Sequence, residues 1–194
     1  MKIEHPFLTT CRDIEDLFLE TLKLSSFCRK LEKQAKIDTD RYPYEKYVGD
    51  GFEFLIEILI KISECDNRIG IAGYTPVLNK DNGVDGYGLN LKGEKCAVQI
   101  KYRGDSSSFL SAESDRLDSF LAESVFENVL PEEKDSCKRH FIFTTAEGLH
   151  YYTQKEKFRN SVKTYGYKEL RELLDNNLHF WRRCLEIIKE NLSK

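Results

Sequence analysis

The segment from Asn79 to Asp105 constrains the fold more than any other part of this 194-residue chain. Two short runs of alternating apolar and polar residues flank a turn near Gly93, which is the pattern of a β-hairpin. Successive side chains of a strand point to opposite faces of its sheet. The second run therefore predicts one apolar face and one partly polar face: Cys96, Val98, Ile100 and Tyr102 on the first, Ala97, Gln99 and Lys101 on the second.

The segments around the hairpin predict an α/β domain. Helices are expected over residues 10–36, from Tyr44 or Gly51 to Ile62 and over about 106–130. A short helix is expected from about Tyr167, and a last helix is expected to end near Asn191. A short strand is expected at 74–78 and a buried strand at 139–149. A hairpin followed by a helix and a further strand indicates a mixed central sheet flanked by helices. The polar segment that holds Pro43 separates an N-terminal helical arm, residues 1–43, from a main domain, residues 44–194.

Composition and charge restrict the function classes. The net charge is −3, so the chain has no general basic coat for nucleic acid. No apolar run is long enough to span a membrane, and the N-terminus has no apolar signal core. We therefore expect a cytoplasmic protein, in the cytoplasm of a host cell if it comes from a virus or mobile element. Its six cysteines show no metal-binding spacing and are expected to be reduced and mostly buried.

Two interpretations of the hairpin remain open from the residues alone. If Gly93 is the centre of the turn, Asp85 lies opposite Lys101 on the same face, and the two form a cross-strand ion pair. The alternative is a divalent metal site. Asp85, the side-chain carbonyl of Gln99 and the backbone carbonyl of Ile100 are oxygen ligands of the kind that Mg²⁺ prefers. Lys101 would then orient a water molecule or stabilise charge on a phosphate.

The hairpin resembles the active-site hairpin of the PD-(D/E)XK nuclease superfamily. Asp85 followed by Gln99-Ile100-Lys101 is similar to the Mrr-like branch, in which a Gln-x-Lys motif replaces the usual acid. The stretch "VGDGFEFLIEILIK" resembles the opening helix of that family, where a Gly-x-Phe-Glu pattern corresponds to Glu53 here. The stretch "LDSFLAES…KRHFIFTTAEGL" resembles the helix and buried strand that follow the hairpin. The proline that often precedes the Asp is absent, and "NGVD" stands in its place.

The resemblance implies a restriction-endonuclease-like fold and a Mg²⁺-dependent DNA endonuclease, with Mn²⁺ able to substitute. It assigns catalysis to Asp85, Gln99, Lys101 and Glu53, and metal binding to Asp85, Gln99, Ile100 and Glu53. Two alternatives share the fold. One is a non-catalytic DNA-binding or assembly module, and the other is a structure-specific nuclease that acts on DNA junctions or on RNA.

Further basic residues are candidates for contact with DNA. Arg103 follows the catalytic strand and can touch a phosphate or pair with Asp105. Arg182 and Arg183, on the last helix, can meet the DNA backbone. Glu57 lies one helical turn after Glu53 and is expected on a solvated face.

A stripe of apolar residues in the N-terminal arm is a candidate dimer contact. A double-strand break needs two sites, and a two-fold homodimer supplies them most simply. The alternative is that the stripe packs on its own domain. Its members lie at helical spacing: Leu17, Leu24, Phe27 and Leu31.

Overall fold

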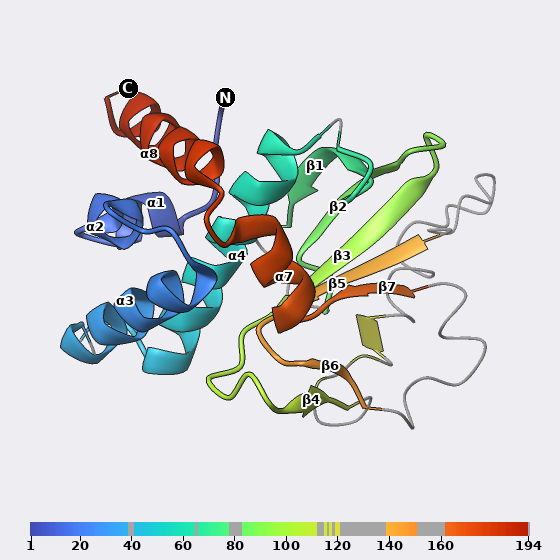
Figure 1. Ribbon diagram of the computed structural model, residues 1–194, viewed down its shortest axis with the longest axis horizontal. Helices are drawn as coiled ribbons and strands as arrows, with labels where there is room; N and C mark the ends of the chain where they lie inside the picture. The colour runs from blue at the N-terminus through green and yellow to red at the C-terminus, as the bar shows by residue number, and fades with distance from the viewer. Residues whose placement is uncertain are drawn as a thin grey trace.

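The helices and strands of the protein follow the predicted order over most of the chain (Figure 1). The structure, a computed structural model, describes residues 1–38, 41–64, 66–77, 83–111, 115, 117, 119–120, 139–150 and 162–193. The helices are α1 (Phe7–Thr10), α2 (Ile14–Phe18), α3 (Leu24–Ile37), α4 (Tyr44–Ile62), α7 (Tyr167–Leu174) and α8 (Leu178–Leu192). The strands are β1 (Ile71–Pro76), β2 (Gly86–Asn90), β3 (Lys95–Lys101), β4 (Phe109–Leu110), β5 (Arg139–Thr144), β6 (Gly148–Leu149) and β7 (Val162–Tyr165).

A five-stranded sheet forms the centre, in the order β1-β2-β3-β5-β7. Strand β2 pairs antiparallel with β1 and β3, whereas β3, β5 and β7 run parallel to one another. This confirms the predicted mixed sheet flanked by helices. Strand β5 is the strand expected at 139–149, and the short strand expected at 74–78 begins earlier, at Ile71. Strand β7 was not predicted.

The helix expected over about 106–130 is wrong at its start. Phe109–Leu110 form strand β4, which pairs in parallel with β6. Hydrogen bonds flank this pairing on both sides, from Glu147 N–H to the Ser108 carbonyl and from His150 N–H to the Leu110 carbonyl, each at 2.8 Å. These partners lie far along the chain, and they override the local preference for a helix. Most of the remainder of that predicted helix lies outside the described residues.

Helix α4 lies between the sheet and helices α1, α3 and α8. It packs against β1 and β3 on one side and against α1, α3 and α8 on the other (Figure 1). A helix buried in this way is apolar nearly all round, as "FEFLIEILI" is. Gly51 lets α3 approach closely, because a Cβ there would lie 2.4 Å from Leu31 Cδ1.

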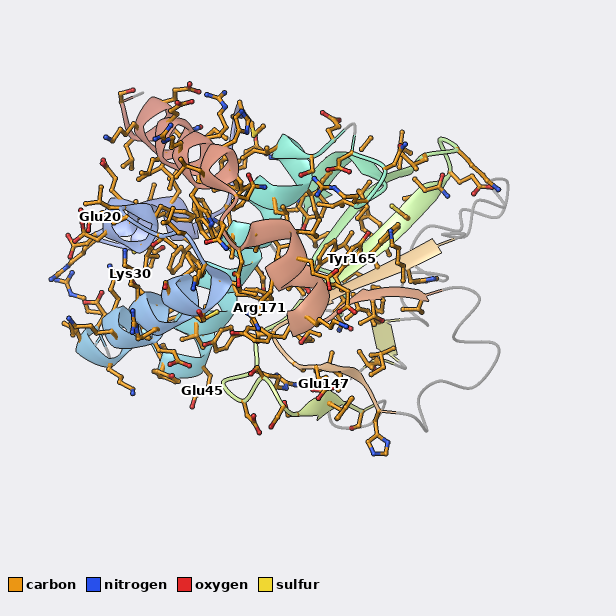
Figure 2. All side chains as sticks on the ribbon, in the orientation of Figure 1. Glu20, Lys30, Glu45, Glu147, Tyr165 and Arg171 are labelled. Atoms are coloured by element: carbon orange, nitrogen blue, oxygen red, sulfur yellow. The ribbon has the colours of Figure 1, made fainter. Side chains whose placement is uncertain are left out.

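The apolar stripe of the N-terminal arm packs inside the molecule. Its four side chains are fully buried, in one core with α4 and α8: Leu17, Leu24, Phe27 and Leu31. Trp181 of α8 lies 6.2 Å, between ring centroids, from both Phe18 and Phe27. Lys30, labelled in Figure 2, donates to Thr21 Oγ1 at 3.0 Å and so joins α3 to the end of α2. The stripe is therefore a contact within the chain, and not an exposed dimer contact.

The two faces of β3 pack in two separate apolar clusters, as the alternation predicts. Cys96, Val98 and Ile100 belong to the large core beneath α4. Ala97 belongs to a smaller cluster on the opposite face of the sheet, with Val84, Leu110, Leu117, Phe120, Ile142 and Ala146. Gln99 alternates with Val98 and Ile100, so its side chain enters this second layer.

Two further expectations concern the whole chain. Within the described residues, no helix has the length and apolarity needed to cross a membrane. The described cysteines are free thiols: Cys11, Cys96 and Cys184 are buried and Cys28 is half-buried. Cys65 and Cys137 lie outside the described residues.

Candidate functional site

The centre of the hairpin turn lies one residue earlier in the chain than predicted. Gly86 pairs with Val98 and Leu89 pairs with Lys95, so the centre of the turn is Lys92 and not Gly93. Gly93 instead takes the left-handed position that ends a three-residue loop, with φ of +76°. A shift of the centre by one residue moves each residue's partner on the other strand by two positions. Every side chain therefore stays on its predicted face. The paired residues end at Gly86, and Asp85 just before it bonds to Val98 and Ile100, so it lies beside residues 98–100 of β3 rather than opposite Lys101.

Asp85 is held against β3 on both sides of Gln99. Its N–H donates to the Val98 carbonyl at 2.9 Å. Its carboxylate oxygen Oδ2 accepts from the Ile100 N–H at 2.5 Å. Two bonds to the neighbouring strand fix both the backbone and the carboxylate of Asp85, which is half-buried.

The Gln99 amide is the most unusual group of the hairpin. Its side chain is 0% exposed, and neither Oε1 nor Nε2 has a hydrogen-bond partner among the described residues. Gly83 lies above it, since a Cβ there would come within 3.6 Å of Gln99 Nε2. An unsatisfied buried polar group costs about 1–3 kcal/mol. Such a cost at a strand end supports a ligand that completes the bonds of the amide.

The remaining predicted groups of β3 lie next to these two. The N–H and C=O of a strand residue project to the same side, so the Ile100 carbonyl faces Asp85 as its N–H does. Lys101, two residues after Gln99 on the same face, is half-buried. Its carbonyl accepts from Thr145 N–H at 3.3 Å, which ties this end of β3 to the end of β5.

The donor set at this strand end fits a divalent cation. Asp85 supplies a carboxylate, Gln99 an unpartnered buried carbonyl oxygen, and Ile100 a backbone carbonyl. All three are hard oxygen ligands, which Mg²⁺ and Mn²⁺ accept.

Glu53 lies on α4 and is engaged by the N-terminal segment. One of its carboxylate oxygens is 3.5 Å from His5 Nε2, and its side chain is 32% exposed. The His5 Nδ1 accepts from Phe7 N–H at 3.2 Å, so the Nε2 atom of the neutral ring carries the hydrogen that faces Glu53. His5 thereby fixes the orientation of this carboxylate.

Tyr74 bonds to the backbone of Asp85, and no local pattern selects it from the sequence alone. Its hydroxyl donates to the Asp85 carbonyl at 3.3 Å. Burial raises the pKa of Tyr74 well above its ordinary value, and the carboxylates of Asp85, Glu57 and Glu53 raise that pKa further. The hydroxyl therefore stays protonated and remains a donor.

Glu57 is buried, and the prediction that it lies on a solvated face is wrong. Its Oε1 accepts from Lys61 Nζ at 2.6 Å, while Oε2 has no partner among the described residues. Its position within the apolar run "FLIEILI" was the available signal, because a helix that is apolar on every side is buried on every side.

We expect Gly86→Ala to destabilise the protein, because Tyr74 occupies the place of the missing side chain. A Cβ at Gly86 would lie 2.4 Å from Tyr74 Cε2. Forcing a methyl group into a packed site costs about 1–3 kcal/mol. The measurement is the free energy of unfolding in urea.

The control for this substitution is Gly49→Ala. Gly49 lies inside α4, and a Cβ there would meet no atom within 4 Å. Alanine is favoured over glycine in a helix by about 0.5–1 kcal/mol, so Gly49→Ala should stabilise the protein slightly. Equal effects of the two substitutions would contradict the packing of Tyr74 on Gly86.

Arg103 pairs with Asp115, and not with Asp105 as one prediction allowed. Its Nη2 forms an ion pair with the Asp115 carboxylate, which is 3% exposed, and its Nη1 donates to the Tyr102 carbonyl at 2.8 Å. Asp105 instead accepts from the N–H of Ser107 at 2.9 Å. The Arg103 guanidinium is thus held in place, with 37% of the side chain exposed.

The structure does not bring Arg182 and Arg183 to the hairpin. Both lie on α8, which packs on α2 and α4, on the side of α4 away from the sheet (Figure 1). Arg183 pairs with Glu186 at 2.9 Å and Glu190 at 3.3 Å. Arg182 is exposed.

No family model matches the chain, and no curated protein matches it significantly.

Proposed function

We propose that this protein is a Mg²⁺-dependent DNA endonuclease with its active site at the carboxyl end of β3. The observation that carries the proposal is the pairing of two groups there. The Asp85 carboxylate is fixed on the β3 backbone, and the buried Gln99 amide beside it has no partner among the described residues. The order of hairpin, crossover and parallel strand also supports the resemblance to PD-(D/E)XK nucleases.

Each residue has a distinct role in this proposal. Asp85, Gln99 and the Ile100 carbonyl hold the cation. A bound Mg²⁺ neutralises charge on the phosphate and lowers the pKa of water. Lys101 carries the positive charge that faces the scissile phosphate and the attacking water. Glu53, which lies on α4 beside His5, is the further carboxylate assigned to this site by the resemblance.

The test of the function is the cleavage of supercoiled plasmid by the purified protein with Mg²⁺ and with EDTA. We expect cleavage that depends on Mg²⁺, with Mn²⁺ able to replace it. Nicked and linear products on the same gel distinguish a single site from the paired sites of a homodimer. Binding without cleavage would favour the non-catalytic module, and cleavage confined to branched DNA or RNA would favour the structure-specific nuclease.

Gln99→Glu tests the metal site without relying on activity. Without metal, a second carboxylate buried beside Asp85 disfavours the charged form and should lower the melting temperature. With Mg²⁺ the added charge strengthens binding, and about tenfold tighter binding adds about 1.4 kcal/mol of stability. We therefore expect Mg²⁺ to raise the melting temperature of Gln99→Glu more than that of the wild type, and we expect some cleavage activity to remain.

The control is Asn67→Asp, the same change of amide to acid at an exposed position. Its response to Mg²⁺ should equal that of the wild type. If Gln99→Glu also responds like the wild type, Gln99 does not face the cation.

A further inference from the structure

A cavity of about 180 Å³ lies just beyond the candidate site, at the carboxyl ends of the parallel strands. The residues that follow each strand line it: Tyr102 to Gly104 after β3, Thr145 after β5 and Tyr167 after β7. In open α/β sheets, ligands bind in the crevice outside the carboxyl ends of the strands. Its lining begins one residue after Lys101, at Tyr102, which packs on the large core on the α4 side of the sheet, whereas Gln99 and Lys101 alternate onto the other face.

Helix α3 of the N-terminal arm forms the opposite wall. The residues that α3 contributes to the lining lie at helical spacing on one of its faces: Ser25, Cys28, Arg29 and Glu32. Figure 2 shows Arg171 where α7 meets α3, and its guanidinium lies 5.8 Å from the centre of the Tyr167 ring. The cavity is therefore built by two parts of the chain that are far apart in sequence.

The lining of the cavity consists mainly of hydrogen-bond donors. Burial raises the pKa of Cys28 to about 12 and also raises the pKa of Tyr167, so both groups stay neutral and protonated near pH 7. Ser25 and Ser106 add hydroxyl groups. The carboxylate in the lining, Glu32, already accepts from the Tyr102 hydroxyl at 2.7 Å.

Two guanidinium groups line the cavity, and Arg103 is already paired with Asp115, so Arg29 supplies the unneutralised positive charge of this pair. Arg29 is exposed on α3, at the mouth of the cavity. Arg103 is oriented by its ion pair with Asp115, and its side chain is 37% exposed. Arginine forks match the oxygens of a phosphate, which only accept hydrogen bonds. Donors and guanidinium groups together favour a phosphate with its sugar over a cation or an apolar ligand.

We propose that this cavity binds the sugar–phosphate backbone of the substrate strand, at a nucleotide next to the one that is cut. This inference rests on the proposed nuclease function. The lining residues Tyr102 to Gly104 follow directly on Lys101, the last residue of β3, so a ligand in the cavity lies past the end of the strand that carries the proposed catalytic groups. The N-terminal arm thereby takes part in substrate binding, with Arg29 as its main contact.

The experiment measures binding of a fluorescently labelled DNA oligonucleotide over a range of salt concentrations. The parent protein carries Asp85→Asn, so that the DNA stays intact. Adding Arg29→Ala should weaken binding about five- to tenfold and reduce the slope of log K against log salt by about one, since one phosphate contact is lost. Arg29→Lys should restore the slope, because it keeps the charge, while part of the affinity stays lost with the fork.

The matched control is Lys36→Ala, which removes the same charge from an exposed position of the same helix outside the cavity. Its affinity and salt slope should equal those of the parent. If Arg29→Ala equals the parent, or if Lys36→Ala weakens binding as much, the cavity is not a backbone site, and plasmid cleavage by the wild type keeps the nuclease proposal. If the wild type neither binds nor cuts DNA, both proposals are wrong.

Discussion

Asp85→Asn should abolish plasmid cleavage while the protein stays folded. The substitution keeps the size of the side chain and its oxygen acceptor, so the bond from Ile100 N–H can persist. It removes the negative charge that the proposed metal site requires. The loss of one such group from a preorganised charged site costs about 3–4 kcal/mol in the transition state, or a factor of about 100 to 1,000 in rate. The measurement is single-turnover cleavage with saturating enzyme and Mg²⁺.

Asp16→Asn is the control for this change, because Asp16 is exposed on α2 and lies in the helical layer away from the sheet. It should cut at the wild-type rate. The melting temperatures and DNA affinities of both variants should stay near those of the wild type. Cleavage by Asp85→Asn within a few-fold of the wild-type rate would contradict the metal-site proposal.

Lys101→Met should also be nearly inactive. Methionine keeps the apolar stem that packs at the half-buried strand end and removes the ammonium group. A donor positioned where charge develops in the transition state contributes about 100- to 1,000-fold to the rate. We expect at least a 100-fold loss in single-turnover cleavage, with little loss of DNA affinity, because one phosphate contact supplies only a small part of it.

Lys95→Met is a matched control on the same strand. Lys95 lies at the opposite end of β3, where its ammonium group is 4.9 Å from the centre of the Tyr87 ring. This variant should cut DNA normally. Normal cleavage by Lys101→Met would instead mean that Lys101 has only a structural role at the strand end, as the ion-pair interpretation of the hairpin implies.

The elements that carry the candidate site could be predicted because their signals are local. The alternation from Cys96 to Tyr102 placed apolar residues under α4 and Gln99 on the other face. The apolar run after Gly51 predicted a helix, and the run at 139–149 predicted a buried strand, which the structure shows pairing in parallel with β3. In each case the period of the side chains decides the element, and the period is visible in the sequence.

The pairing inside the site could not be predicted in the same way. The turn residue Gly93 suggested a centre one position too late, since a glycine marks the left-handed residue of a loop and not its midpoint. Strand β7 has only four residues, too few for a clear alternation, and it forms because β5 supplies its hydrogen bonds. Glu57 is polar in sequence and buried in the fold, because elements pack on every side of α4.

By itself, the sequence determined the hairpin, its two faces and the group of Asp85, Gln99 and Lys101 at one end of it. Only the tertiary structure decided which groups are buried and what lies beside them. It left the Gln99 amide without a partner among the described residues, and it brought Glu32 of the arm to Tyr102 across 70 positions of the chain. The physical reason is that periodicity is a property of neighbouring residues. Burial and hydrogen bonding instead depend on partners that only the folded chain brings together.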